Sequence, residues 1–219
     1  MNLEAISRRV PDYDVFLTLA QMDESTRALR AQYPDVVTVF EAGHSQEGRP
    51  LLCMRIGQGP KNALIFGCPH PNEPIGAMML EAFSRMLCED AALRQSLPYT
   101  FYIIKAADPD GLVRNEGWLK GPFSYYNYAR HFYRPASKQQ VEWTFPLSYK
   151  TLDFHTPLPE TRALMRIIED TRPAFLYSLH NSAFGGVFWY INRADSRLIH
   201  RLPEVPARHG IPLSLGEPE

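Results

Sequence analysis

His70 and Glu73 stand three residues apart in a polar turn, directly after the apolar run at residues 63–66. Imidazole nitrogens and carboxylate oxygens both bind zinc well, and a catalytic zinc site takes three protein ligands and leaves a fourth position open. A second histidine, His180, directly follows another apolar run at residues 174–179. We interpret His70, Glu73 and His180 as candidate zinc ligands, since a metal held by them would activate a water molecule and polarise a carbonyl oxygen.

The two apolar runs are predicted to be the strands that position these side chains. Residues 63–66 form an unbroken apolar stretch, which is typical of a strand buried on both faces, and residues 174–179 have the same character. In neighbouring parallel strands, His70 and His180 would meet at the carboxyl edge, where open α/β sheets bind ligands. The alternative is that they are unrelated loop histidines, because His-x-x-Glu is a short pattern that also occurs by chance.

Helices and strands alternate along the chain. Pro74 precedes an apolar pattern of helical spacing at 75–87, and proline is favourable at the first position of a helix. Further helices are predicted at 15–33, 93–97 and 159–169, and further strands at 36–40, 51–56, 100–106 and 187–191, with a tight turn at 108–111. This order predicts an α/β fold with a mixed, largely parallel central sheet and helices on both faces. No repeat or linker divides residues 1–219, so we expect a single domain.

A long segment, residues 112–159, follows no helical or strand pattern. It is rich in aromatic side chains, namely Trp118, Phe123, Tyr125, Tyr126, Tyr128, Phe132, Tyr133 and Trp143. So many aromatic residues argue against disorder and favour a functional loop, with packing as the alternative role for these side chains. Arg114 and Arg130 lie in this segment, and a planar guanidinium matches a carboxylate. Both are candidate substrate-binding residues, with solvated surface positions as the alternative.

Composition narrows the class of protein. The 219 residues carry a net charge of −1, so nothing indicates a nucleic-acid partner. Cys53, Cys68 and Cys88 form no Cys-x-x-Cys pair, and we expect reduced thiols in the core. The N-terminus lacks the pattern of a signal peptide, and no apolar segment is long enough to span a membrane. We therefore expect a soluble, cytoplasmic protein.

Four motifs, in this order along the chain, resemble those of the zinc carboxypeptidase family, the carboxypeptidase A-like metallopeptidases. Residues 43–51 resemble its Gly-x-Ser-x-Glu-Gly-Arg-x-Leu motif, and residues 70–73 match its His-x-x-Glu zinc motif. Residues 108–111 are similar to its Asn-Pro-Asp-Gly turn, with aspartate in place of asparagine. Residues 178–181 resemble its strand-end histidine, and the resemblance as a whole extends from residue 13 to residue 191.

The resemblance implies a zinc-dependent metallocarboxypeptidase, which hydrolyses a C-terminal peptide bond with metal-activated water. It assigns the Zn²⁺ cofactor to His70, Glu73 and His180, each at its matching motif position. The family's general-base glutamate, and the tyrosine before it, lie near the last strands, further along than this chain reaches at Glu219. We therefore expect the C-terminal part of the domain to be missing, so that this chain binds zinc but hydrolyses peptides slowly or not at all, and the sequence identifies no catalytic residue.

Basic residues of the aromatic segment are implied to bind the substrate. Arg130 matches the arginine that holds the terminal carboxylate of a peptide, although Ala129 stands where the family has asparagine. The family's oxyanion-binding arginine follows the turn matched by residues 108–111, and here both Arg114 and Lys120 are close to that place.

Two other functions remain open on the sequence alone. Residues 70–74 also resemble the His-Gly-Asn-Glu-Pro turn of zinc deacylases, which would make an N-acyl amino acid the substrate. The aromatic segment from 118 to 143 would instead serve a non-catalytic zinc- or peptide-binding module. Turnover of acyl-amino acids distinguishes the first from a carboxypeptidase, and peptide affinity without turnover distinguishes the second.

Overall fold

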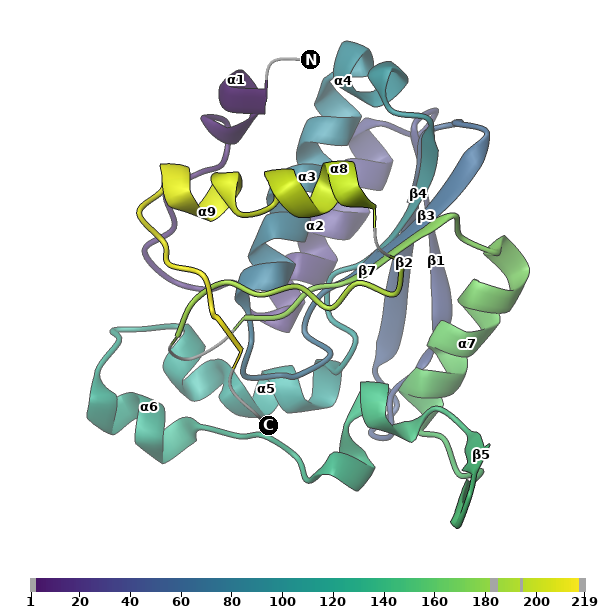
Figure 1. Ribbon diagram of the computed structural model, residues 1–219, viewed down its shortest axis with the longest axis vertical. Helices are drawn as coiled ribbons and strands as arrows, with labels where there is room; N and C mark the ends of the chain where they lie inside the picture. The colour runs from purple at the N-terminus through teal and green to yellow at the C-terminus, as the bar shows by residue number, and fades with distance from the viewer. Residues whose placement is uncertain (1–2, 182–184, 194, 217–219) are drawn as a thin grey trace. The chain divides into compact units, whose positions relative to one another are not determined.

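The computed structural model of this chain describes residues 3–181, 185–193 and 195–216. The chain divides into two compact units, Met1–His180 and Asn181–Glu219, which we describe separately. The first unit holds the central sheet and its covering helices, drawn from purple to green in Figure 1. The expectation of a single domain stays a prediction.

The sheet of the first unit is mixed. Its strands are, in spatial order, β1 (Val37–His44), β2 (Pro50–Ile56), β4 (Tyr99–Ile104), β3 (Lys61–Phe66) and β7 (Phe175–Ser178). The pairs β1–β2 and β2–β4 are antiparallel, whereas β4–β3 and β3–β7 are parallel. The predicted α/β fold with a mixed sheet is confirmed, and its parallel pairs lie together at the β7 end.

The helices of this unit include the long ones that the sequence predicts. They are α1 (Leu3–Ser7), α2 (Leu19–Gln32), α3 (Ile75–Glu89), α4 (Ala91–Ser96), α5 (Pro109–Leu119), α6 (Tyr125–His131) and α7 (Pro159–Thr171). The start of α2 is fixed by a capping box, in which the Thr18 side chain accepts from the Gln21 backbone N–H and the Gln21 side chain bonds the Thr18 backbone. This cap shortens the helix predicted at 15–33.

Helices cover both faces of the sheet. Successive side chains of the central strand β3 point to opposite faces, where they pack against different helices. Ala63 and Ile65 of β3 share a core with residues of α2 and α3, including Leu80. Leu64 and Phe66 point to the opposite face and share a core with residues of α7. The unbroken apolar run of β3 therefore reflects burial on both faces, as predicted.

Strand β7 differs from that prediction. Its residues Phe175, Leu176 and Tyr177 are 42%, 44% and 37% exposed. Within the described part of the sheet, β7 pairs with β3 alone and is an edge strand. The expectation that residues 174–179 form a strand is right, but the expectation that both its faces are buried is wrong, since an apolar run also suits an edge strand.

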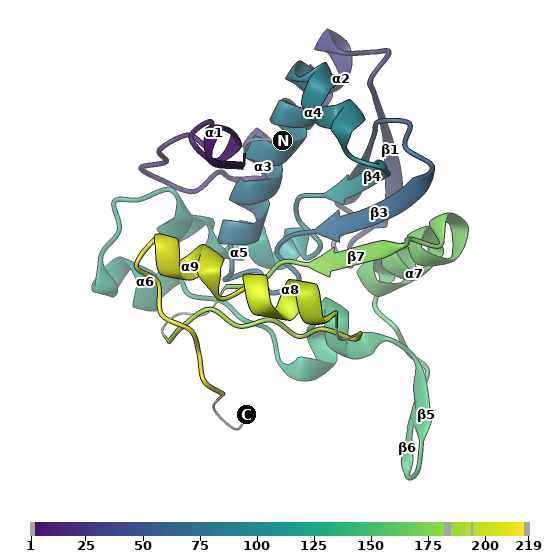
Figure 2. The same cartoon turned by 45° about the horizontal axis from the view of Figure 1, so that its top comes forward.

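Residues 112–159 are more ordered than the sequence predicts. The predicted tight turn at 108–111 is instead the start of α5, where Asp108 is the N-cap and Pro109 the first helical residue. After α6 come two 3-10 helices, η1 (Ser137–Gln139) and η2 (Val141–Thr144), and the antiparallel hairpin of β5 (Leu147–Tyr149) and β6 (Leu152–Phe154). This hairpin projects from the body of the first unit (Figure 2). Most of these elements are too short for a periodicity that needs about 11 residues or more to be detected.

The second unit contains α8 (Ser196–Arg201) and α9 (Glu204–Arg208). The strand predicted at 187–191 is wrong for the described residues, where only Val187 pairs, in a single parallel bridge with Leu213. Across both units, no described helix has the length and apolar character needed to cross a bilayer. The three cysteines are buried free thiols, as predicted.

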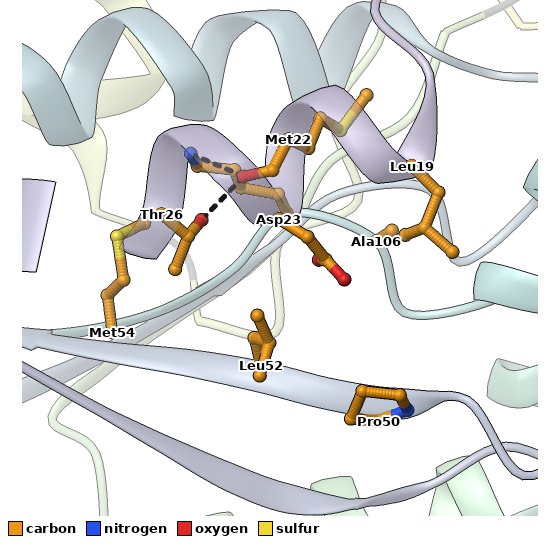
Figure 3. Close-up of a pocket in the computed structure, with 9 residues that line it drawn as sticks. Leu19, Met22, Asp23, Thr26, Pro50, Leu52, Met54 and Ala106 are labelled. Carbon is orange, nitrogen blue, oxygen red and sulfur yellow. Dashed lines mark hydrogen bonds between the residues drawn. The ribbon is translucent and has the colours of Figure 1, made fainter. Parts of the chain in front are cut away.

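A buried ion pair joins α3 to the end of β4. Lys105 Nζ lies 2.5 Å from Glu81 Oε2, and both residues are at most 5% exposed. Lys105 also lines a small pocket between α2 and β2, where Figure 3 shows the Asp23 side chain and the hydrogen bond from Thr26 to the Met22 carbonyl. Burial lowers the pKa of Lys105, partly offset by the attraction of Glu81. The ion pair of Glu81 and Lys105 therefore links helix α3 to the end of strand β4 inside the protein core.

Replacing Glu81 with glutamine is expected to lower the free energy of unfolding by about 3–5 kcal/mol, because the Lys105 ammonium then stays buried without its carboxylate. Urea unfolding at pH 7 measures this change. Arg85→Gln is the control, since Arg85 is an exposed partner of the same carboxylate at 3.3 Å and its loss should cost about 0–1 kcal/mol. Equal costs for the two variants would contradict the prediction.

Candidate functional site

The carboxyl ends of β3 and β7 bring the two candidate histidines together. In the parallel register Phe66 lies opposite Ser178, so both strands end at the same edge of the sheet. His70 and His180 follow within a few residues, and the centres of their rings are 4.7 Å apart. The predicted neighbourhood of the two strands is thus what places the imidazoles side by side.

Glu73 lies against the Nδ1 atoms of both rings. Its Oε1 is 3.0 Å from His70 Nδ1 and its Oε2 is 2.9 Å from His180 Nδ1. The turn that carries it is closed by a hydrogen bond from the Glu73 backbone N–H to the His70 carbonyl, and α3 begins just after Pro74. The structure therefore places all three predicted ligands in mutual contact.

A second carboxylate, Glu142 of η2, lies against the other nitrogens. Its Oε2 is 2.9 Å from His180 Nε2 and 3.9 Å from His70 Nε2, and the Ser178 hydroxyl donates to its Oε1. One nitrogen of each histidine and one oxygen of Glu142 all lie within 4.8 Å of one another. His70 Nε2 is buried and has no hydrogen-bond partner among the described residues. The imidazoles are thus flanked by two carboxylates, of which the sequence predicts one.

The charges of this cluster stabilise one another. Burial acts to raise the pKa of Glu73, but hydrogen bonds from His180 and His70 hold it down to about 2. Burial acts to lower the pKa of His180, but its bonds to Glu142 and Glu73 raise it to about 9. The pKa of Glu142 is also lowered, since the bonds from His180 and Ser178 outweigh its burial. At neutral pH both carboxylates are therefore ionised and His180 is protonated, so the charges within the cluster compensate one another.

The donor set fits a zinc ion. Two imidazole nitrogens and one carboxylate are the ligand types of a catalytic zinc site, and the Nδ1 atoms and Glu73 supply them from one side. Zinc-binding histidines almost always donate their other ring N–H to a carboxylate, carbonyl or water. Glu142 lies where it can accept from His180 Nε2 at 2.9 Å, whereas His70 Nε2, at 3.9 Å from the same oxygen, has no hydrogen-bond partner among the described residues. His70, Glu73 and His180 would then hold the ion and Glu142 would orient the ring of His180.

Arg134 completes the site and is not predicted from the sequence. Its Nη1 lies 2.8 Å from Glu73 Oε1 and its Nη2 lies 3.1 Å from His70 Nδ1. The side chain is 34% exposed, so the guanidinium borders both the buried cluster and solvent. The basic character of residues 112–159 is the signal that could have pointed to it, but no motif separates it from the neighbouring arginines.

The two arginines that the sequence favours have other partners. Arg114 Nη2 lies 2.6 Å from Glu47 Oε1, and its guanidinium lies 5.0 Å from the centre of the Tyr133 ring. Arg130 is exposed on α6, where its Nη1 donates to the Tyr126 hydroxyl at 3.1 Å. Among the interactions of the described residues, neither joins the His70–Glu73–His180 cluster.

The motif at residues 43–51 is tied to the start of α5. Asp110 accepts from the Ser45 hydroxyl at 2.6 Å, from Arg49 Nη1 at 2.7 Å and from the Glu47 backbone N–H at 2.9 Å. These bonds join two motifs that are far apart in sequence. Their role in this structure is to fix the start of α5, which leads toward the segment that carries Arg134.

Asp108, the N-cap of α5, is buried beside other carboxylates. Burial raises its pKa to about 7, against the hydrogen bond from the Gly111 N–H, and the charges of Glu160 and Asp110 raise it further. The folded protein thus keeps this proton between about pH 4 and pH 7, whereas the unfolded chain releases it near pH 3.8. Because the native state binds more protons in that window, the stabilisation is complete at low pH and is lost as the pH rises through 7.

Replacing Asp108 with asparagine should remove this loss, since asparagine is as good an N-cap and carries no charge. We expect the variant to be more stable than the parent at pH 7.5 by about 2–4 kcal/mol and to differ little from it at pH 4. Urea unfolding at the two pH values measures both differences, with the exposed Asp153→Asn as the control. A gain of the same size at both pH values would contradict this account.

Comparison with known proteins identifies a family and individual relatives to which this chain is similar. The family model described as zinc carboxypeptidase matches residues 22–197. Carboxypeptidase E of Caenorhabditis elegans is 30% identical over 122 residues, which cover 47% of this chain and 26% of that protein. Carboxypeptidase A6 of Mus musculus is 31% identical over 109 residues, covering 46% and 25%. The matches thus span about a quarter of these curated relatives.

The fold has relatives among solved structures. The carboxypeptidase A from Helicoverpa armigera superposes with a TM-score of 0.61 at 19% sequence identity. The superposition covers 94% of this chain and 59% of that one. The mixed sheet with its flanking helices is therefore shared with a longer protein.

Proposed function

The chain belongs to the zinc carboxypeptidase family, and on this premise we propose that it is a zinc-dependent metallocarboxypeptidase, which hydrolyses the C-terminal peptide bond of a peptide. The observation that carries the proposal is the convergence of His70, Glu73 and His180 at the carboxyl edge of β3 and β7. These three residues would hold a zinc ion, which would supply a nucleophilic water near neutral pH and polarise the scissile carbonyl.

The residues around the ligands have supporting roles in this proposal. Glu142 accepts from His180 Nε2 and keeps the Nδ1 atom of that ring directed toward Glu73, and its charge also lies 3.9 Å from His70 Nε2. His70 and Glu73 are buried, which strengthens the electrostatic interactions of the site.

Arg134 is the cation that we propose to contact the substrate. Its guanidinium touches the ligand cluster and is partly open to solvent. A planar fork of N–H donors suits a carboxylate or a carbonyl oxygen that gains charge during hydrolysis. Arg130 and Arg114 are exposed on the same segment and remain candidate contacts for the terminal carboxylate. No general base is assigned among the described residues.

Hydrolysis of an N-acylated dipeptide tests the proposal, with the reaction monitored as the release of the C-terminal amino acid. Release should require zinc, stop after treatment with a chelator and return when zinc is restored. Glu73→Gln is the matched control, because it changes one ligand while retaining the volume of the side chain. Zinc binding with peptide affinity and no turnover would favour a binding module, and cleavage of N-acyl amino acids alone would favour a deacylase.

A further inference from the structure

Asn115 of α5 is fully buried and uses its whole hydrogen-bonding capacity. Its Nδ2 donates to the Gly111 carbonyl at 2.9 Å and to the Tyr133 carbonyl at 2.8 Å. Its Oδ1 accepts from Trp118 Nε1 at 2.7 Å and from the Tyr133 backbone N–H at 3.0 Å. A primary amide offers two donors and two acceptor positions, so no capacity is left over.

Two of these bonds go to the backbone of one residue, which lies 18 positions further along the chain. Tyr133 belongs to the connection between α6 and η1, where no strand or helix supplies backbone partners. The Asn115 amide replaces them, because it satisfies both the N–H and the carbonyl of Tyr133 as a neighbouring strand would. The position of this connection is therefore set by a side chain of α5.

Other contacts with α5 fix the same connection. A Cβ on Gly117 would lie 2.4 Å from the His131 ring, so the end of α6 sits directly on the backbone of α5. On the other side of Asn115, the Arg114 guanidinium lies over the Tyr133 ring. The residue after Tyr133 is Arg134, whose guanidinium reaches Glu73 and His70.

We propose that Asn115 is a positioning residue: by holding the Tyr133 backbone, it directs the Arg134 guanidinium to the Glu73–His70 pair. This inference rests on the proposed function, in which Arg134 contacts the substrate. Asn115 itself touches neither the ligand cluster nor a substrate, and it acts through the two backbone bonds to Tyr133.

The test compares Asn115→Ala with Trp118→Phe. The phenylalanine variant removes one buried hydrogen bond of the same amide and leaves both bonds to Tyr133 in place. Both variants should lose thermal stability, but only Asn115→Ala should lower kcat/KM, by about tenfold or more, with unchanged zinc content.

Labelling with phenylglyoxal gives a readout that needs neither metal nor turnover. In metal-free protein the Arg134 guanidinium is held by Glu73 and His70, so peptide mass spectrometry should show slow modification. The rate should rise about threefold or more in Asn115→Ala and stay unchanged in Trp118→Phe. If the parent binds no zinc but the labelling difference is found, the proposed function fails while the positioning role stands.

A double variant separates positioning from general destabilisation. In an Arg134→Ala background, Asn115→Ala should cause little additional loss of kcat/KM, because both changes remove the same interaction. Additive losses would overturn the inference. Equal effects of Asn115→Ala and Trp118→Phe on Arg134 labelling would overturn it as well.

Discussion

Replacing His180 with alanine should reduce the zinc content of the purified protein from about one equivalent to near zero, because two remaining ligands do not complete a zinc site. His180 follows β7 and is the third ligand in our assignment, and its Nδ1 lies on the same side of the cluster as His70 Nδ1. Elemental analysis after dialysis measures the zinc, and circular dichroism shows that the variant is folded. Retention of stoichiometric zinc by folded His180→Ala would contradict the assignment of the site.

Two glutamine variants decide which side of the imidazoles binds the ion. Glu73→Gln removes a ligand in our assignment and should abolish stoichiometric binding. Glu142→Gln keeps an acceptor for His180 Nε2, so it should weaken zinc binding by about 10–100-fold without abolishing it. The reverse order would place the ion on the Nε2 side, where His70, His180 and Glu142 also converge. Titration with zinc against a chromophoric chelator separates the two outcomes.

The part of the site that is predictable from sequence depends on regular strands. An apolar run followed by a polar turn predicts where β3 ends, and parallel pairing of β3 with β7 then brings His70 and His180 together. Local sequence also gives Glu73, since it belongs to the same turn as His70. The ends of the two strands follow from the pattern of apolar residues. Their pairing follows from the expectation that strands of buried type lie side by side in one parallel sheet.

Glu142 and Arg134 could not be predicted in the same way. Glu142 lies in a four-residue 3-10 helix, which is held by the buried hydroxyl pair of Thr144 and Thr161, 2.6 Å apart. Arg134 follows Tyr133, which is held by the side chain of Asn115. Both positions are set by contacts between residues far apart in sequence, and such contacts leave no periodic signal in the segment itself.

The differences between the predicted and the observed fold also arise from contacts that a local sequence pattern does not show. The residues at the start of α5 are predicted as an isolated turn, because aspartate, proline and glycine are common both in turns and at the start of a helix. The exposure of β7 depends on its place at the edge of the described sheet, whereas its composition matches that of buried β3. Sequence patterns therefore identify long periodic elements such as α3 more reliably than they identify short elements or the neighbours of a strand.

Arg134→Ala is expected to lower kcat/KM for a peptide substrate by about 10²–10³-fold, the effect of removing one preorganised donor from a developing oxyanion. Zinc content should stay close to that of the parent, because Arg134 is not a ligand in our assignment. Arg134→Lys should recover only part of the loss, since an ammonium lacks the planar fork that bonds Glu73 and His70. Steady-state kinetics with the zinc-loaded variants measure each effect.

Comparison with other arginines decides whether the effect belongs to this position. Arg162→Ala is the control, because Arg162 is exposed on α7 and donates to the Pro157 carbonyl. Arg130→Ala tests the assignment that the family resemblance favours. If Arg130 contributes more than Arg134, the α6 helix must approach the ligands when substrate binds, since Arg130 bonds Tyr126 in this structure. If Arg134 contributes more, the contact with Glu73 and His70 already shows the position from which the substrate is held.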